Sequence, residues 1–160
     1  SVGVHSVLLF LEKIRLDRAM QAFAHIRSLT PAKLANIQSM ELTVHLINRK
    51  TFSGNYEGFK SSGKIGYIKN KGLKNAILAY YQESMPSLDQ TEQFRNKKGV
   101  EIIELVGESN LKAHQFSDPR MRTRLGFVEQ ATAALIESYT ICIGQADLIT
   151  AEIEKELLHS

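Results

Sequence analysis

The sequence has no tryptophan, one cysteine and three prolines among its 160 residues. The lone cysteine, Cys142, has no second cysteine to pair with, which excludes a disulfide-stabilised scaffold. The longest uninterrupted apolar run, Val7–Leu11, is far shorter than the ~20 residues that cross a bilayer. The net charge of +3 is too small to indicate nucleic acid or anionic lipid as a partner.

Enough apolar side chains are present to build a core, since 43% of the residues are hydrophobic and 23% are charged. This composition excludes a disordered chain and is typical of one globular domain, which we expect to span residues 1–160. The apolar residues recur mostly three or four positions apart, which is helical spacing. No segment shows the alternation of a β-strand. The predicted fold class is therefore all-α.

The first half of the chain predicts two long helices. Thr30 and Pro31 indicate the start of the second, because a hydroxyl can cap a helix and proline fits its first position. The apolar positions after them predict that this helix continues to about Asn48. The helix before them is expected from Val4 to about Arg27. Its apolar positions have helical spacing: Val4, Leu8, Leu11, Leu16, Met20, Phe23 and Ile26.

Glycines and serines interrupt the pattern over residues 51–70, where we expect a short helical insertion. Asn70 is a capping residue and predicts the start of a third helix. Pro86 predicts the end of that helix or a kink in it, because the residue before a proline avoids the helical conformation. A fourth segment is expected over residues 86–106, with a break possible at 96–99.

The last helix has the clearest periodicity and is expected over residues 121–157. Its inner stripe follows steps of three and four residues: Leu125, Val128, Thr132, Leu135, Tyr139, Cys142, Ala146, Ile149, Ile153 and Leu157. At 1.5 Å per residue it would be roughly 55 Å long, which predicts an elongated antiparallel bundle of four main helices. Gly126 and Gly144 are its expected kink points. A second apolar row widens the stripe to the face of a bundle helix. Its members recur every seven residues: Phe127, Ala134, Ile141 and Leu148.

Motifs for catalysis and for metal or cofactor binding are weak. Residues 58–64 match the opening of a phosphate-binding loop, but Ile65 stands where a hydroxyl would bind magnesium and no buried strand precedes the loop. We therefore expect no cofactor, no metal and no enzymatic activity. The histidines lack the spacing of metal ligands. They lie far apart in the sequence: His5, His25, His45, His114 and His159.

Basic residues dominate the stretch 49–74, where Glu57 is the only acidic residue and aromatic residues are interspersed. Such a stretch can follow a phosphate backbone. The alternative function that it predicts is a soluble nucleic-acid-binding regulator. The candidate phosphate contacts are four lysines: Lys60, Lys64, Lys69 and Lys71.

Residues 56–70 read YEGFKSSGKIGYIKN, followed by LKNAI at 73–77 and the pair Tyr80-Tyr81. This order resembles an uncharacterised family of bacterial proteins with one transmembrane helix near the N-terminus and a helical domain after it. Members typically carry Tyr-x-x-Leu-Lys-Ser-Ser-Gly, then Ile-x-Asn and Tyr-Tyr; here Phe59 replaces the leucine. The closing AEIEKEL at 151–157 is similar to the end of that family.

The resemblance implies an extracytoplasmic domain, tethered to the inner membrane by a segment that is not in this chain. No activity or ligand is carried over from the family. On physical grounds, Tyr56 and Phe59 share a helical face and Gly63 can adopt a left-handed conformation that ends their turn. Adjacent tyrosines point to different sides, so one can fill the core while the other meets a ligand. The candidate ligand-binding residues are Tyr56, Ser61, Ser62, Tyr80 and Tyr81.

The function that we expect is a non-enzymatic sensing or interaction domain of a membrane-tethered, periplasmic bacterial protein. Its partner would be a small molecule or another protein. Association of identical chains is left open, because a wide apolar stripe can be covered within the bundle or by a partner helix.

Overall fold

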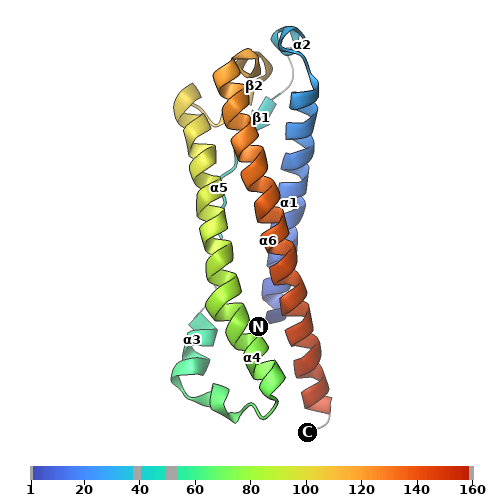
Figure 1. Ribbon diagram of the computed structural model, residues 1–160, viewed down its shortest axis with the longest axis vertical. Helices are drawn as coiled ribbons and strands as arrows, with labels where there is room; N and C mark the ends of the chain where they lie inside the picture. Colours follow the sequence, from blue (N-terminus) through green and yellow to red (C-terminus); the bar gives the residue numbers. More distant parts are fainter. Residues whose placement is uncertain (1, 38–40, 50–53, 159–160) are drawn as a thin grey trace. The chain divides into compact units, whose positions relative to one another are not determined.

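The computed structural model describes residues 2–37, 41–49 and 54–158. The start of the expected insertion, residues 51–53, and residues 38–40 of the expected second helix lie outside the described residues. Helices make up most of the described chain, and the sheet is limited to two short strands (Figure 1). The all-α prediction is confirmed.

The elements follow one another as α1 (Val2–Ser28), α2 (Pro31–Asn36), β1 (Glu41–Thr43), α3 (Gly54–Ser61), the 3-10 turn η1 (Lys64–Tyr67), α4 (Lys71–Ala79), the π-helical segment η2 (Tyr80–Ser84), α5 (Met85–Val106), β2 (Asn110–Lys112), the 3-10 turn η3 (Ala113–Ser117) and α6 (Pro119–Leu158).

Three helices begin at side chains that cap them. The Thr30 hydroxyl accepts a hydrogen bond from the Lys33 amide at 3.3 Å, with Pro31 at the first helical position of α2. Asn70 Oδ1 accepts from the Leu73 amide at 3.1 Å and starts α4. Asp118 Oδ1 accepts from the Arg120 amide at 2.8 Å just before α6. The starts predicted at Thr30 and Asn70 are confirmed, because a cap needs only residues within one turn.

The described chain divides into two compact units. Unit 1 comprises residues 1–13, 49–90 and 137–160, and unit 2 comprises residues 14–48 and 91–136. Each of α1, α5 and α6 contributes a stretch to either unit. A single domain and an elongated bundle stay predictions.

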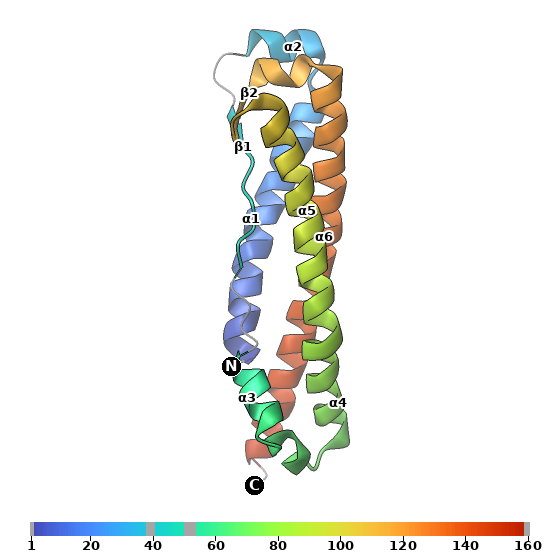
Figure 2. The same cartoon turned by 90° about the vertical axis from the view of Figure 1, so that its left-hand side faces the viewer.

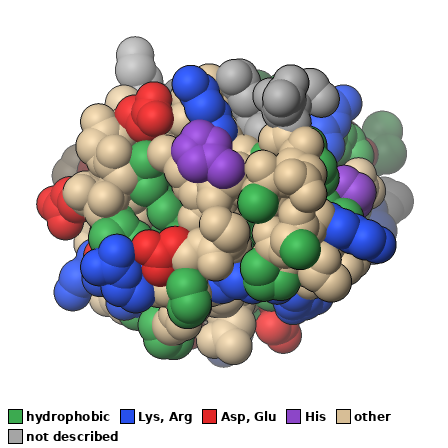
Figure 3. Space-filling model, turned by 90° about the horizontal axis from the view of Figure 1, so that it is seen from above, with side chains coloured by type: hydrophobic (Ala, Val, Ile, Leu, Met, Phe, Trp, Pro, Cys, Tyr) green, Lys and Arg blue, Asp and Glu red, His purple; other side chains and the backbone are tan. Residues whose placement is uncertain are grey.

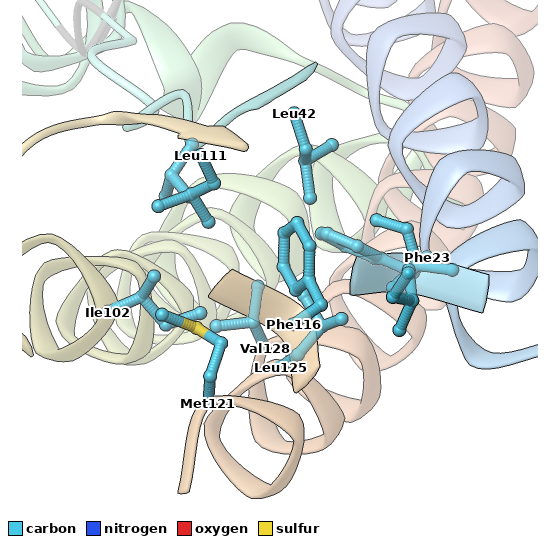
Figure 4. Packing of buried hydrophobic residues seen from close by; sticks show 11 residues of the cluster. Phe23, Leu42, Ile102, Leu111, Phe116, Met121, Leu125 and Val128 are labelled. Atoms are coloured by element: carbon cyan, nitrogen blue, oxygen red, sulfur yellow. The ribbon is translucent and has the colours of Figure 1, made fainter. Parts of the chain in front are cut away.

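Unit 2 has a dense apolar core in which short non-helical elements supply several of the buried side chains. Leu42 comes from β1, Leu111 from β2 and Phe116 from η3, and all three point toward the helices (Figure 4). Phe116 is fully buried. Val44 comes from the extended segment after β1, and the helices contribute the remaining members: Phe23, Ile26, Leu34, Ile102, Met121, Leu125 and Val128. The connection between α5 and α6 therefore supplies two residues of the core, Leu111 and Phe116.

The second helix is much shorter than predicted. It ends at Asn36; β1 then pairs antiparallel with β2, with Leu42 opposite Leu111, and residues 44–49 continue without helix or strand (Figure 2). The strands were missed as well. Leu42 and Val44 are both buried although they belong to no helix, because strand residues two apart point to the same side. Leu42 and Val44 alone do not show from the sequence whether the segment is a helix or an extended chain.

Helix α5 supplies the hydrogen bonds that an extended segment needs. Asn96 Oδ1 accepts from the Ile47 amide at 2.8 Å, while Asn96 Nδ2 donates to the Ile47 carbonyl at 2.7 Å. Arg95 donates to the His45 carbonyl. A Cβ at Gly99 would lie 3.1 Å from Leu46 and 3.2 Å from Val44, so glycine permits the close approach. Residues 96–99, expected as a possible break, instead hold the extended segment against an intact helix.

Pro86 does not end its helix either. The backbone widens into η2 just before it, and the Met85 amide donates to the Tyr80 carbonyl five residues back. A proline lacks an amide hydrogen and its ring crowds the carbonyl four residues earlier. A π turn relieves such conflicts by shifting the hydrogen-bond register. Helix α4 therefore runs on through η2 into α5 (Figure 1).

Helix α6 runs without interruption through Gly126 and Gly144, which were expected as kink points. Its predicted inner stripe is buried from Leu125 to Ile149. The prediction that the second row is buried is wrong. Phe127, Ile141 and Leu148 are among the exposed hydrophobic residues, and Leu148 is 70% exposed. That row therefore does not widen the buried face. Whether a second chain covers it stays a prediction.

The first turns of α1 face the opposite way to the prediction. Val4 and Leu11 are more than half exposed, whereas His5 and Leu9 are buried. The later positions Leu16, Phe23 and Ile26 are buried as expected. The error arises because apolar residues lie on both sides of the helix here, so that periodicity alone does not select the inner one.

Figure 3 views the molecule from the end that carries α2. Basic, acidic and hydrophobic side chains are interspersed on this face, in keeping with the small net charge.

Candidate ligand pocket

Three tyrosines and a histidine form an aromatic cluster in unit 1. The Tyr56 and Tyr81 rings are stacked, with centroids 4.4 Å apart and planes 8° from parallel. Tyr80 meets Tyr81 edge-on at 5.0 Å, and His5 lies 6.1 Å from Tyr81 at a steep angle. Gln82 Nε2 donates to the Tyr56 hydroxyl at 3.0 Å, which fixes the orientation of that ring.

The cluster borders a pocket of about 400 Å³. Its wall combines residues from the start of α1, from α3, from the connection to α4, from α4 and η2, and from the last turns of α6. The side chains are mainly aromatic and aliphatic: Val2, His5, Asn55, Tyr56, Phe59, Ile68, Leu73, Ile77, Tyr81, Ile153, Glu156 and Leu157.

Local sequence explains most of this wall. Tyr56 and Phe59 lie three residues apart on α3 and both line the pocket. Gly63 has a φ of 73°, a left-handed conformation that lets the chain turn after α3, as predicted. The chain then reaches the Asn70 cap, and Leu73, Ile77 and Tyr81 follow at four-residue steps on one face.

Burial controls the ionisation of the aromatic cluster. It lowers the pKa of His5 below its ordinary value, and the nearby charge of Arg49 lowers that pKa further. The imidazole ring is therefore neutral around pH 7. Burial also raises the pKa of Tyr81, and the neighbouring Tyr56 adds to the effect. The pKa of Tyr80 is raised even more strongly by burial. Both hydroxyls keep their protons at physiological pH.

The five candidate ligand-binding residues divide into three groups. Tyr56 and Tyr81 line the pocket. Tyr80 is fully buried, and its hydroxyl has no hydrogen-bond partner among the described residues. The Ser61 hydroxyl donates to the Gly58 carbonyl at 3.2 Å and the Ser62 hydroxyl to the Phe59 carbonyl at 2.9 Å. Both serines are exposed and lie outside the pocket lining.

Several lining residues were not singled out from the sequence. His5, Ile153 and Glu156 come from the two ends of the chain, far from the segment 56–81. Periodicity indicated that α6 has an inner stripe reaching Ile153, but it gave no sign of what that stripe meets. For His5 and Glu156 we find no sequence signal that would have identified them.

Two further hollows lie in unit 1. One, of about 320 Å³, lies between α4 and α6 and is lined by Ala76, Leu148 and Gln145, among others. The Gln145 Oε1 atom is buried without a hydrogen-bond partner among the described residues. The other, of about 240 Å³, lies beside Ser84 and Cys142. The Cys142 thiol is buried, as predicted, 3.8 Å from the Ser84 carbonyl oxygen.

The lysines of the alternative hypothesis are on the surface. Lys60, Lys64, Lys69 and Lys71 are all exposed, and none forms an ion pair with a residue that the structure describes. Lys60 Nζ lies 6.0 Å from the centroid of the Tyr56 ring. Arg49 does not add to this surface, because it pairs with Asp89 and its side chain is only 6% exposed.

Within the described ranges, no cluster of histidine, cysteine, aspartate and glutamate has the geometry to bind a metal ion. No helix in this part of the chain is both long enough and apolar enough to span a membrane.

Comparison of the chain with protein-family models, with curated proteins and with solved structures gave no match.

Proposed function

We propose that this chain is a non-enzymatic sensing domain that binds a small, largely apolar molecule in the pocket of unit 1. The observation that carries the proposal is the pocket itself, with its volume of about 400 Å³ and its wall of aromatic and aliphatic side chains. Sites for small molecules typically enclose about 300–1,000 Å³ and are lined mainly by such side chains. A molecule of roughly ten to fifteen non-hydrogen atoms would be accommodated.

Contacts within the protein hold the aromatic wall of the pocket. The stacked Tyr56 and Tyr81 rings hold one another, and the hydrogen bond from Gln82 holds Tyr56. Preformed side chains lose little conformational freedom on binding, so that more of the contact energy appears as affinity.

A ligand in this pocket would join parts of the chain that are far apart in sequence. Phe59 lies on α3, whereas Ile153 and Leu157 lie on the last turns of α6. Leu157 is 71% exposed, so its apolar surface is still open to water. Covering that surface would favour the arrangement in which α3 and the end of α6 face the ligand together. Such a difference in contacts is what a sensor needs to change its population of states.

The pocket is tested with 4-phenylbutan-1-ol, a neutral molecule of suitable size, by following the backbone amide signals of the isotopically labelled chain in NMR spectra. We expect saturable shifts concentrated at residues around the pocket. Ile153→Trp should abolish these shifts, because the indole would occupy the pocket. Ile141→Trp is the matched control, since Ile141 lines only the hollow beside Cys142. Shifts that spread over the whole surface, or that survive Ile153→Trp, would contradict the proposal.

Tethering of the domain to the bacterial inner membrane on its periplasmic side is also part of the proposal. The support is the resemblance of residues 56–70 and Tyr80-Tyr81 to single-span membrane proteins. Fractionation of the full-length product should place the domain in the membrane fraction, and protease added to spheroplasts should cleave it. A product that stays soluble and protected from the protease would refute the tether.

Nucleic-acid binding is the second candidate, supported by the exposure of the four lysines Lys60, Lys64, Lys69 and Lys71. Binding of this kind weakens steeply with salt, because each neutralised phosphate releases counterions. Lys60→Gln and Lys64→Gln should then weaken binding and reduce its salt dependence. If a labelled single-stranded oligonucleotide shows no binding at low salt, this candidate is eliminated.

A further inference from the structure

The described lining of the pocket holds one acidic residue, while the nearby basic residues Arg49 and Lys60 lie outside that lining. Glu156 is the only lysine, arginine, aspartate or glutamate among the described lining residues. Asn70 Nδ2 donates to its Oε1 atom at 2.9 Å, which positions the carboxylate at the pocket wall. Its Oε2 atom accepts no hydrogen bond from a residue that the structure describes. A donor on a bound molecule would find an acceptor there.

The histidine in the wall adds no positive charge to balance this carboxylate. His5 is buried, and both its burial and the nearby Arg49 oppose its protonation. Near neutral pH the part of the lining that the structure describes therefore carries the charge of Glu156 alone.

The aromatic residues add a second preference for positive charge. Tyr56, Phe59 and Tyr81 all contribute to the wall, and the faces of aromatic rings attract cations. The faces with which Tyr56 and Tyr81 stack on one another are not open to a ligand, and the Lys60 ammonium group already lies 6.0 Å from the Tyr56 centroid, so this contribution falls to the remaining ring faces. An aromatic and aliphatic wall next to one carboxylate favours a ligand with an apolar body and one cationic group.

We infer that the ligand of this pocket is a lipophilic amine, whose apolar part packs against Tyr56, Phe59 and Tyr81 while its ammonium group pairs with Glu156. This inference rests on the proposed function and adds the chemical class of the ligand. A carboxylate of the same size is disfavoured, because it would meet Glu156 without a cationic partner in the described lining. A neutral analogue keeps the apolar contacts and loses only the charge interaction.

Three probes with the same phenylbutyl group separate the contribution of apolar contacts to the affinity from that of charge: 4-phenylbutylamine, 4-phenylbutan-1-ol and 4-phenylbutyrate. Their affinities are measured at pH 7.5 by NMR titration of the full chain. We expect the amine to bind about fivefold tighter than the alcohol, because a partly exposed charge pair and a cation–π contact each contribute modestly. The carboxylate should bind weaker than the alcohol. Raising the salt concentration to 0.5 M should reduce the advantage of the amine.

Glu156→Gln tests the role assigned to the carboxylate. In this variant the amine should bind no tighter than the alcohol, while the affinity for the alcohol stays the same. Glu154→Gln is the matched control, because Glu154 is an exposed residue of the same helix outside the lining. It should leave the fivefold preference intact. Thermal unfolding of both variants checks that they are folded.

The possible outcomes distinguish this inference from the function on which it rests. If none of the three probes binds in the pocket, the proposed function fails and the inference fails with it. If the alcohol binds as tightly as the amine, the proposal that the pocket binds a small molecule is supported, and the inference that its ligand is cationic is refuted. Retention of the preference for the amine in Glu156→Gln would overturn the pairing with Glu156.

Discussion

The two units differ in what their described side chains build: an apolar cluster in unit 2, and the walls of several hollows in unit 1. In unit 2, Leu42, Leu111 and Phe116 come from short strands and a 3-10 turn and are buried among helical residues. Unit 1 contains the three hollows described above, together with the buried Tyr80 hydroxyl and the Gln145 amide oxygen that have no partner among the described residues. The apolar cluster around Phe116 and the ligand-sized pocket beside Tyr81 therefore belong to different parts of this chain.

The two units also differ in how they accommodate irregular backbone. Unit 2 uses Arg95 and Asn96 of α5 to satisfy an extended segment, so that irregular backbone is held by side chains. Unit 1 instead widens a helix into the π-helical segment η2, which places Tyr80 in the interior and Tyr81 at the pocket. Segments of this type occur frequently at functional sites. Stability is thus expected to depend more on unit 2 and binding more on unit 1.

The largest contrast should come from one phenylalanine in each unit. Phe116→Ala in unit 2 should lower the free energy of unfolding by about 3–5 kcal/mol, because it empties a fully buried site. Phe59→Ala in unit 1 should cost about 1 kcal/mol or less, since Phe59 is half-buried and already faces a pocket. Urea unfolding followed by circular dichroism measures both. Equal losses would contradict the difference in burial assigned to these two phenylalanines.

The extended segment provides the next contrast. Asn96→Ala should destabilise the fold by about 1–3 kcal/mol, because it leaves both the amide and the carbonyl of Ile47 without their partner. Lys97→Ala, at an exposed position next along α5, is the control and should change stability by less than about 0.5 kcal/mol. Hydrogen exchange of the Ile47 amide provides a local readout. Unchanged protection in Asn96→Ala would contradict the assigned role.

A pair of hydroxyl deletions compares two tyrosines within unit 1. Tyr56→Phe should cost about 1 kcal/mol, because Gln82 loses its acceptor. Tyr80→Phe should be neutral or stabilising by up to about 1 kcal/mol, because the hydroxyl that it removes is buried without a partner among the described residues. Thermal unfolding of the two variants decides the matter. A clear loss in Tyr80→Phe would indicate that the hydroxyl is bonded, for example to an ordered water.

The smallest effect is expected at two glycines of α6, one in each unit. Gly126→Ala and Gly144→Ala should each raise the free energy of unfolding by about 0.5–1 kcal/mol, because alanine is the better helix former and its Cβ meets nothing within 4 Å at either position. Gly99→Ala is the informative contrast and should destabilise, because its Cβ would crowd Val44 and Leu46. Unfolding in urea provides the comparison.

Prediction from the sequence succeeded where the structure is local. The caps at Thr30 and Asn70, the left-handed Gly63 and the buried stripe of α6 were all predicted, and each depends on residues within a few turns of helix. It failed where distant segments meet. The extended chain at 44–48 is stabilised by Asn96, which lies 49 residues beyond Ile47. That partner leaves no mark on the local pattern.

The candidate site was predicted in part for the same reason. Tyr56 and Tyr81 were found because both belong to one conspicuous motif, whereas Ser61 and Ser62 belong to it and do not reach the pocket. A sequence motif gives proximity along the chain, and only two of the five candidate side chains, those of Tyr56 and Tyr81, line the pocket. His5 and Glu156 enter the site from the opposite ends of the chain.

Local patterns in the amino-acid sequence are enough to predict the helical class of this protein, several of its helix starts and the inner face of its last helix. These follow from caps and apolar spacing, which act over a few residues. The tertiary structure alone decided that residues 44–48 stay extended, that Pro86 sits in a continuous helix and that Glu156 stands beside an aromatic pocket. Those outcomes depend on contacts between segments that are far apart in the sequence. Without these contacts, the alternative local conformations differ little in free energy.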